Sequence, residues 1–388
     1  MKSCIHIPRI ILPLEGFEKW AVIACDQFTS DQEYWKRVTK EVGDSPSTLR
    51  FILPEAFLGE DDEDRIEQIH AEMYRALEDG KTEKLLRGCV LTERKTESGV
   101  RRGIVAALDL EAYTMEKGVS SPIRSSEEVV PARLPARVKV RAGAPLEFPH
   151  AMVFYRDPKD KIMRGLLDEE LELLYNFELM EGGGHIRGSF IPEDLALAVT
   201  REMHQKSEPS FAVADGNHSV AAAKAYWEQI KKTLSAEERE NHPARYTLVE
   251  LVNVYDKAII FHPIHRLVKG VDVEAFCDFF TRKVKCKRKG NVLFPALPAG
   301  AEGVKRTDEL AEEFVRINTG EIDYIHGEEE LEAFSKQENC VGIMLAPPDK
   351  DDFFPQLKGG NNFPKKTFSI GQAREKRYYL EGREISYD

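Results

Sequence analysis

Cysteine, long apolar runs and excess positive charge are all scarce in this 388-residue chain. The six cysteines are scattered and form no Cys-x-x-Cys pair. This pattern argues against a disulfide framework or a zinc site of paired cysteines, and it predicts reduced thiols in a cytoplasmic protein. No apolar run approaches the length of a membrane span, and the apolar N-terminal segment is short and broken by prolines. We therefore expect neither a membrane partner nor a signal peptide.

The charge balance is acidic, with a net charge of −12 and an isoelectric point near 5.5. This balance argues against nucleic acid or an anionic membrane as the main partner. The chain is long enough for two domains or one large domain with an ample core. No feature of the sequence specifies an oligomeric state.

The most informative stretch covers residues 211 to 227 and reads FAVADGNHSVAAAKAYW. It predicts a buried strand, a polar loop and an alanine-rich helix. The loop lies at the helix N-terminus, where unpaired N–H groups and the macrodipole favour an anion such as a phosphate. Gly216 allows a positive φ or the close approach of a ligand, and Asn217 or Ser219 is suited to cap the helix.

Two side chains of this loop are suited to chemistry. Asp215 is a candidate metal ligand or proton acceptor, and His218 is a candidate proton donor or relay. A second interpretation stays open, because turns of this composition commonly do no more than connect a strand to a helix. The chain contains no G-x-x-x-x-G-K-[ST] run, so the loop is not a P-loop.

A second strand–loop–helix unit is predicted near the N-terminus. Residues 20–25 (WAVIAC) predict a buried strand, and the run from Ser30 to Glu33 predicts a capping box that opens a helix. Asp26 lies in the loop between them, and both a structural and a functional interpretation of it stay open. Cys25 beside it is interpreted as a small buried apolar residue rather than a nucleophile.

Three further segments allow more than one interpretation. Residues 118–149 form a basic band, which suits either an anionic ligand or a solvated loop and edge strand. Residues 175–190 predict a β-hairpin around three glycines (182–184), with phosphate binding by the glycine N–H groups as the alternative. His262 and His265 have the spacing of metal ligands, but proline between them breaks the helix that would align both rings.

Several short boxes resemble the family known as domain of unknown function 1015. The run from Asp215 to Ser219 resembles its D-G-H-H-R or D-G-H-T-R box, with Asn217 in place of the first histidine and Ser219 in place of the arginine. Further resemblances are spread from Asp26 to Phe368, and they lie at Asp26, 124–127, 253–266, 322–327 and 363–368.

That family resembles the free-serine kinases of the ParB/sulfiredoxin-like superfamily. The resemblance implies a small-molecule substrate, ATP or ADP as co-substrate, and Mg²⁺. The implied catalytic residues are Asp215, His218, Asp26 and Glu127, and Asp215 is also the implied metal ligand. The implied nucleotide- or phosphate-binding residues are Gly216, Asn217, Ser219, Arg124, His265, Arg266 and Lys366. In this scheme Arg266 supplies the forked phosphate contact that Ser219 cannot make.

The strands interspersed among helices predict a mixed α/β (α+β) fold. The resemblance implies that its core is ParB/sulfiredoxin-like, with additional strands and helices. We place a division near residue 205, between an N-terminal α/β region (1–205) with the basic segment 118–149 and a second region (206–388) with the loop and helix described above.

The leading hypothesis for function is a small-molecule phosphotransferase that binds a nucleotide with Mg²⁺. One alternative is a non-enzymatic nucleotide-binding switch of the ParB type. The other is a metal-dependent hydrolase, built on the histidines His185, His218, His262 and His265.

Overall fold

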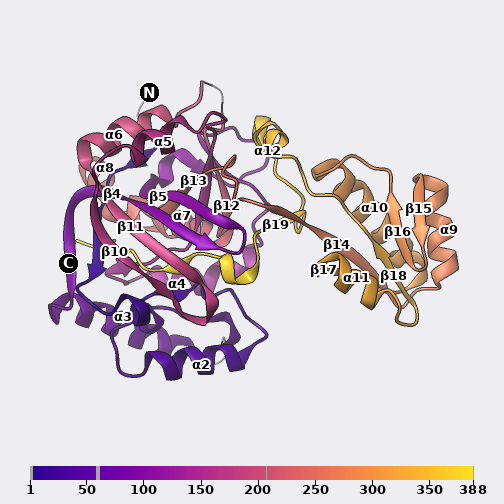
Figure 1. Ribbon diagram of the computed structural model, residues 1–388, viewed down its shortest axis with the longest axis horizontal. Helices are drawn as coiled ribbons and strands as arrows, with labels where there is room; N and C mark the ends of the chain where they lie inside the picture. Colours follow the sequence, from indigo (N-terminus) through magenta and orange to yellow (C-terminus); the bar gives the residue numbers. More distant parts are fainter. Residues whose placement is uncertain (1–2, 58–61, 207, 388) are drawn as a thin grey trace. The chain divides into compact units, whose positions relative to one another are not determined.

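The structure is a computed structural model that describes residues 3–57, 62–206 and 208–387. The chain forms two compact units. Unit 1 comprises Met1–Ile259 and Gln372–Asp388, and unit 2 comprises Ile260–Gly371. Each unit has its own sheet and its own helices (Figure 1). The fold is therefore mixed α/β, as the sequence predicts.

Unit 1 is built on an eleven-stranded sheet in the order β10-β11-β4-β5-β13-β9-β12-β7-β6, with β1 paired to β5 and β2 to β4. Its strands are β1 (Ile5–His6), β2 (Arg9–Pro13), β3 (Val22–Ile23), β4 (Thr82–Thr96), β5 (Gly99–Asp109), β6 (Tyr113–Thr114), β7 (Ile123–Ser125), β8 (Leu146–Glu147), β9 (Met152–Tyr155), β10 (Glu172–Leu179), β11 (Gly184–Pro192), β12 (Phe211–Asp215), β13 (Tyr246–Asn253), β20 (Tyr378–Tyr379) and β21 (Arg383–Glu384). Its α-helices are α1 (Phe17–Trp20), α2 (Gln32–Val42), α3 (Asp62–Glu78), α4 (Leu134–Arg141), α5 (Lys161–Leu167), α6 (Glu193–Glu202), α7 (Asn217–Ile230) and α8 (Ala236–Asn241).

Both faces of this sheet are covered. Successive side chains of a strand point to opposite faces, so one strand contributes to the packing on both sides. In β4, Val90 packs into a core cluster that includes residues of α2 and α3. Its neighbours Cys89 and Leu91 pack into a second cluster that includes residues of α5, α6 and α7. Figure 1 shows α2 and α3 on one side of the long strands and α5 and α6 on the other.

The local predictions for the central stretch are confirmed within a few residues. The predicted strand is β12, and the predicted helix is α7, which already begins at Asn217. The predicted hairpin is the antiparallel pair β10 and β11. The capping prediction near the N-terminus is wrong in detail, because the side chain of Asp31, and not that of Ser30, accepts the N–H of Tyr34 at 2.9 Å. Within the basic segment, α4 is a helix where we expect a loop.

Residue 205 lies inside unit 1, between α6 and β12. The sheet continues across this point, because β12 pairs with β9 and β7, which both precede it in the chain. The boundaries of the compact units instead fall after Ile259 and before Gln372. The C-terminal segment from Gln372 thus belongs to the same unit as the N-terminal strands.

Unit 2 is built on a six-stranded sheet in the order β15-β16-β18-β14-β17, with β19 paired to β14. Its strands are β14 (Phe261–Lys269), β15 (Cys286–Lys289), β16 (Val292–Pro295), β17 (Glu321–His326), β18 (Cys340–Ile343) and β19 (Phe368–Ile370). Its α-helices are α9 (Val273–Lys283), α10 (Ala301–Asn318), α11 (Glu328–Phe334) and α12 (Lys350–Gln356). Residues of α9 and α10 form one core cluster with residues of β14 and β18.

None of the helices formed by the described residues is long and apolar enough to cross a membrane.

Candidate functional site

The corner between β12 and α7 requires a glycine. Gly216 has φ 76° and ψ 27°, in the left-handed region that other residues rarely adopt. A Cβ atom at this position would lie 2.9 Å from the Cα of Ala151, which is closer than real contacts allow. The carbonyl of Gly216 accepts the N–H groups of Ser219 at 3.0 Å and Val220 at 3.2 Å, which starts the helix.

Asn217 and His218 hold the chain after β7. Asn217 is buried, and its Oδ1 accepts a hydrogen bond from Ser125 Oγ at 2.7 Å and from the N–H of Ser126 at 3.2 Å. His218 Nε2 accepts the N–H of Val130 at 3.1 Å, so the proton of a neutral ring is on Nδ1. The prediction that Asn217 or Ser219 caps α7 is wrong, because Gly216 is the N-cap residue and no side chain accepts a capping hydrogen bond. These contacts position the helix N-terminus against β7.

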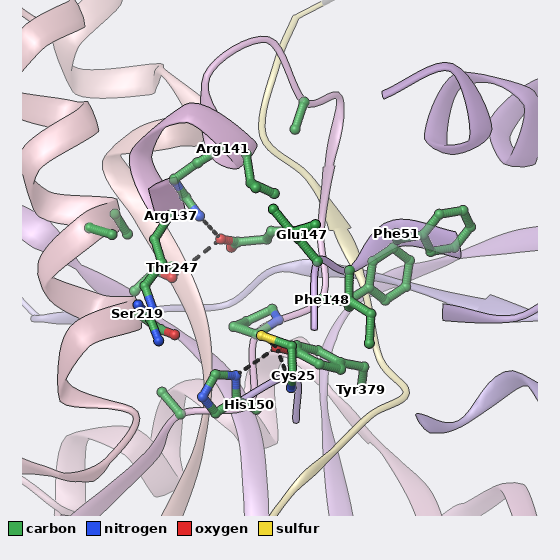
Figure 2. Close-up of a pocket in the computed structure, with 18 of the residues that line it drawn as sticks. Cys25, Phe51, Arg137, Arg141, Glu147, Phe148, His150, Ser219, Thr247 and Tyr379 are labelled. Carbon is green, nitrogen blue, oxygen red and sulfur yellow. Dashed lines mark hydrogen bonds and ion pairs between the residues drawn. The ribbon is translucent and has the colours of Figure 1, made fainter. Parts of the chain in front are cut away.

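A pocket of about 150 Å³ lies beside the first turns of α7 (Figure 2). Its lining includes Ser219 and Val220 of α7, residues of α4, and aromatic side chains from both ends of the chain. In the view of Figure 2, Arg137, Ser219 and Thr247 lie on one side, Phe51 and Phe148 lie on the other, and Cys25, His150 and Tyr379 lie at the lower end. The predicted anion-binding corner therefore adjoins a real cavity.

The lower end of the pocket contains a chain of polar side chains. The His150 ring is buried, and its Nδ1 lies 3.0 Å from the hydroxyl oxygen of Tyr379, which in turn lies 3.1 Å from the sulfur of Cys25. His150 Nε2 lies 3.6 Å from a carboxylate oxygen of Asp26. The antiparallel pairing of β20 with β3 places Tyr379 opposite Val22, and so beside the loop that carries Cys25 and Asp26.

The electrostatics of this end keep Asp26 ionised and Cys25 protonated. Burial alone would raise the pKa of Asp26, but His150 first, and then Arg137 and Lys376, lower it well below the ordinary value. Burial, followed by the negative charge of Asp26, raises the pKa of Cys25 to about 11. At neutral pH the site thus offers a carboxylate and a neutral thiol, so Cys25 is not an activated nucleophile.

Lys376 lies between two acidic groups. Its ammonium nitrogen is 3.1 Å from a carboxylate oxygen of Asp215, and its charge also lowers the pKa of Asp26. The lysine side chain is largely buried, with 13% of it exposed. It is therefore a held cation next to the end of β12, which leads into the β12–α7 corner.

Buried ion pairs fix the C-terminal segment that carries Lys376 and Tyr379. Arg377 contacts Glu250 of β13 at 3.0 Å and also contacts Glu381. Arg94 of β4 donates hydrogen bonds to the carbonyl groups of Gly183, Arg374, Glu375 and Lys376. These contacts order residues that would otherwise form a loose tail, and they give Lys376 a fixed position.

Several residues of the basic segment line the pocket, whereas Arg124 of the same segment stabilises the loop before β7. Arg137 lines the pocket and forms an ion pair with Glu55. Arg124 is fully buried, and its Nη1 donates to the carbonyls of Glu116 at 2.6 Å and Val119 at 2.8 Å. Glu127 is half-buried, and its carbonyl accepts a hydrogen bond from the hydroxyl of Ser125 at 2.6 Å.

Two of the three predicted ligands in unit 2, Arg266 and His265, are engaged within that unit. The guanidinium of Arg266 binds Asp308 with Nε at 2.6 Å and Nη2 at 3.0 Å, and its Nη1 donates to the carbonyls of Ile264 and Lys366. His265 is buried, and its Nδ1 accepts the N–H of Leu345 at 3.1 Å. The side chain of Lys366 is exposed. Arg266 thus holds unit 2 together and has no donor pair left over for a phosphate fork.

The described residues around the β12–α7 corner do not form a metal site of their own. Asp215 already pairs with Lys376, and Asp26 lies beside His150. Across the described ranges, no group of three or more His, Cys, Asp or Glu side chains is arranged to hold a metal ion. We therefore assign no ligand set for Mg²⁺, and the geometry does not favour a hydrolase built on histidines.

Of the residues in and around this pocket, the sequence analysis names Asp26, Asp215 and Ser219 as candidates, but it does not name His150, Lys376 or Tyr379. His150 lies between Pro149 and Ala151, just ahead of β9, and it belongs to none of the short boxes that resemble the family. Lys376 and Tyr379 lie in the charged C-terminal run REKRYYLEGRE, which has the composition of a solvated tail. The two adjacent tyrosines among those charges are the only signal that this run packs against a core.

The pocket residues come from a chain that matches a known family. A sequence model described as "Protein of unknown function (DUF1015)" matches residues 10–351. A search among curated proteins returned no match.

Three solved structures show a distant likeness. A free serine kinase in complex with AMP shares 11% identity, with 71% of this chain and 90% of that chain covered and a TM-score of 0.37. A variant of free serine kinase in complex with ADP shares 12% identity, with 71% and 91% covered and a TM-score of 0.38. A conserved hypothetical protein from Pyrococcus furiosus shares 11% identity, with 73% and 95% covered and a TM-score of 0.35.

Proposed function

This chain belongs to the family of proteins of unknown function called DUF1015, and we propose that it is a phosphotransferase that moves a phosphoryl group from a nucleotide to the hydroxyl of a small molecule. One observation carries the proposal. Lys376 pairs with Asp215 just before α7, and its charge also lowers the pKa of Asp26, so an ionised carboxylate, a buried lysine and the N-terminus of α7 come together from distant parts of the sequence. Ser219 of α7 lines one pocket together with Cys25 and His150, which adjoin Asp26. Phosphoryl transfer needs these three things: a proton acceptor, a fixed cation and an anion-binding corner.

The roles follow from the geometry of each group. The N-terminus of α7, with the hydroxyl of Ser219, binds the phosphates of ATP or ADP. Lys376 neutralises the charge of the transferring phosphoryl group, in place of the arginine that is absent at Ser219. Asp26 accepts the proton of the acceptor hydroxyl, and His150 holds that carboxylate in place. A carboxylate with a low pKa suffices, since bond making to the nucleophile lags in a loose transition state.

The balance of the reaction is simple. The acceptor oxygen forms a bond to the terminal phosphorus of the nucleotide, and the bond from that phosphorus to the bridging oxygen breaks. ATP leaves as ADP, or ADP leaves as AMP, and the hydroxyl proton passes to Asp26. No step is assigned to Mg²⁺.

We further propose a ParB/sulfiredoxin-like core and a cytoplasmic location, and the free state of all six cysteines supports this location.

Thermal unfolding with nucleotides tests the binding half. ATP, ADP and AMP are each added with and without Mg²⁺, and a nucleotide at one hundred times its Kd stabilises the protein by about 2.7 kcal/mol. We expect Lys376→Met to reduce this stabilisation, and the exposed Lys366→Met to retain it. Absence of any nucleotide effect would refute the proposal. Bound metal without a nucleotide effect would favour the hydrolase instead.

Product formation tests the transfer half. We expect Asp26→Asn to lower kcat by about 10²- to 10⁴-fold, because it removes the proton acceptor, while the nucleotide-dependent stabilisation persists. The exposed Asp44→Asn is the matched control and should leave kcat unchanged. Nucleotide-dependent assembly with no phosphorylated product would identify the switch as the correct function.

A further inference from the structure

The walls of the pocket are mostly apolar, which bears on what the acceptor can be. The apolar lining residues include Phe51, Met73, Val140, Leu146, Phe148 and Ile385. Most of them belong to a core cluster of unit 1, so the wall is part of the packed interior and its shape is fixed.

The charged groups in the lining are already neutralised by one another. Arg137 pairs with Glu55, and Arg141 pairs with Glu147. Glu147 also contacts Arg383, and it accepts a hydrogen bond from Thr247 at 3.2 Å. Figure 2 shows the contacts of Arg141 and Thr247 with Glu147 at one end of the pocket. A free amino acid would have to break such a pair to find partners for its carboxylate and its ammonium group.

The opposite end of the pocket is polar, and the thiol of Cys25 and the hydroxyl of Tyr379 at this end are uncharged. The raised pKa of Cys25 keeps the thiol protonated, and burial raises the pKa of the Tyr379 hydroxyl well above its ordinary value. His150 connects this end to the carboxylate of Asp26 at 3.6 Å. A hydroxyl group placed here has hydrogen-bond partners and lies near the proton acceptor.

From this arrangement we propose that the acceptor is an alcohol with an uncharged, apolar body. The body is an aromatic ring or a branched aliphatic chain that fills the pocket between α4 and the wall of Phe51 and Phe148. Its hydroxyl lies at the end formed by Cys25, His150 and Tyr379. This inference rests on the proposed phosphotransferase activity and adds the class of acceptor.

Two acceptors separate this class from a free amino acid. With one nucleotide held at saturation, kcat/KM is measured for 2-phenylethanol and for serine. We expect kcat/KM to be about a hundredfold higher for 2-phenylethanol. Burial of its ring contributes favourably to the free energy of binding, whereas burial of the unpaired charges of serine is unfavourable. Preference for serine would overturn the inference while leaving the phosphotransferase proposal intact.

A variant that fills the pocket locates the acceptor body. Val140 of α4 lines the pocket and is half-buried, so Val140→Phe reduces the cavity without touching a polar group. We expect at least a tenfold loss of kcat/KM for 2-phenylethanol, mainly through KM, and no loss of nucleotide-dependent stabilisation. Val119→Phe is the matched control, since Val119 is 43% exposed, and it should change neither quantity.

The remaining outcomes are also decisive. If Val140→Phe weakens nucleotide binding and not acceptor use, the pocket holds the nucleobase and the inference is wrong. If Val140→Phe does not fold, Ala222→Val makes a smaller change in the same lining and is measured in the same way. If the unmodified protein shows no nucleotide-dependent stabilisation at all, the proposed function itself has failed, which is a different result from a preference for serine.

Discussion

Unit 1 and unit 2 both contain cationic side chains that the sequence offers as phosphate ligands, but they use them differently. In unit 1, Lys376 is held beside Asp215 at the end of β12. In unit 2, the guanidinium of Arg266 donates hydrogen bonds to Asp308 and to two backbone carbonyls, and it lies 4.7 Å from the ring centre of Tyr324. We propose that the first cation binds a ligand, whereas the contacts of the second stabilise unit 2.

The contrast bears on which cation replaces the arginine of the family pattern, which this chain lacks at Ser219. The missing arginine at Ser219 suggests a substitute, and Arg266 is the obvious choice in sequence because it is an arginine in a second matching box. The hydrogen bonds of Arg266 argue against this role. A buried guanidinium that already binds a carboxylate and two carbonyls would lose these partners on binding a new anion, and would gain little in return. A lysine outside every box provides the better geometry.

The largest expected effect comes from breaking the ion pair of Arg266. Arg266→Met leaves the partly buried Asp308 without its partner, which costs about 3–5 kcal/mol of the free energy of unfolding of unit 2. The measurement is urea unfolding followed by hydrogen exchange of unit 2 amides. Arg282→Met, on the exposed face of α9, is the control and should stay within about 0.5 kcal/mol. Loss of nucleotide binding with unchanged stability would restore Arg266 as a ligand.

The next effect is a dependence of the stability of unit 2 on pH. Burial first, and then the charges of Arg266 and His326, lower the pKa of His265 to about 4. An unfolded histidine has a pKa near 6.5, so below about pH 6.5 the unfolded chain takes up a proton that folded unit 2 does not. Stability is therefore lost as pH falls from about 6.5 to about 4, by up to about 3 kcal/mol.

Substitution of each histidine assigns this pH dependence to its unit. His265→Gln should flatten the loss in unit 2, as measured by urea unfolding across this pH range with hydrogen exchange of unit 2 amides. His6 has a pKa lowered to about 4 mainly by burial, so His6→Gln is the matched substitution in unit 1 and should leave the slope of unit 2 unchanged. An unchanged slope in His265→Gln would show that the ring is not the responsible group.

Two glycines with positive φ separate backbone strain from close packing. Gly216 combines φ 76° with a clash against the backbone of Ala151, whereas Gly359 of unit 2 has φ 68° and open space around it. Gly216→Ala should cost about 2–4 kcal/mol, from strain and overpacking together, and Gly359→Ala about 1–2 kcal/mol, from strain alone. Thermal unfolding measures both. Equal costs would mean that the β12–α7 corner can shift away from Ala151.

Local structure around this corner could be predicted from sequence because it depends on neighbours in the chain. The strand β12, the helix α7 and the role of Gly216 all follow from a short apolar run, an alanine-rich run and a glycine between them. The division near residue 205 could not be predicted reliably, since the pairing of β12 with β9 and β7 is a long-range property. The same holds for the C-terminal segment, whose charges look solvated in sequence.

The candidate site shows the same limit. Asp26 and Ser219 are visible because each lies at a predicted strand–loop–helix junction. His150 and Lys376 are not, because their roles arise only when β20 pairs with β3 and when Arg377 reaches Glu250. No spacing rule connects residues that lie 354 positions apart, as Cys25 and Tyr379 do.

The smallest expected effect tests the other predicted ligand of unit 2. Lys366 has φ 56°, so its backbone is in a region that suits glycine, and its carbonyl accepts a hydrogen bond from Arg266 at 2.9 Å. Lys366→Gly removes the strain of about 1–2 kcal/mol and adds chain entropy to the unfolded state, so the net gain in stability should stay below about 1 kcal/mol. The side chain itself contributes nothing to this balance because it is exposed. Lys366→Ala keeps the strain and should leave stability within about 0.5 kcal/mol of the unmodified protein. If both variants instead lose nucleotide-dependent stabilisation in thermal unfolding, the side chain of Lys366 is a phosphate ligand. Unit 2 would then contribute a cation to nucleotide binding, as unit 1 is proposed to do.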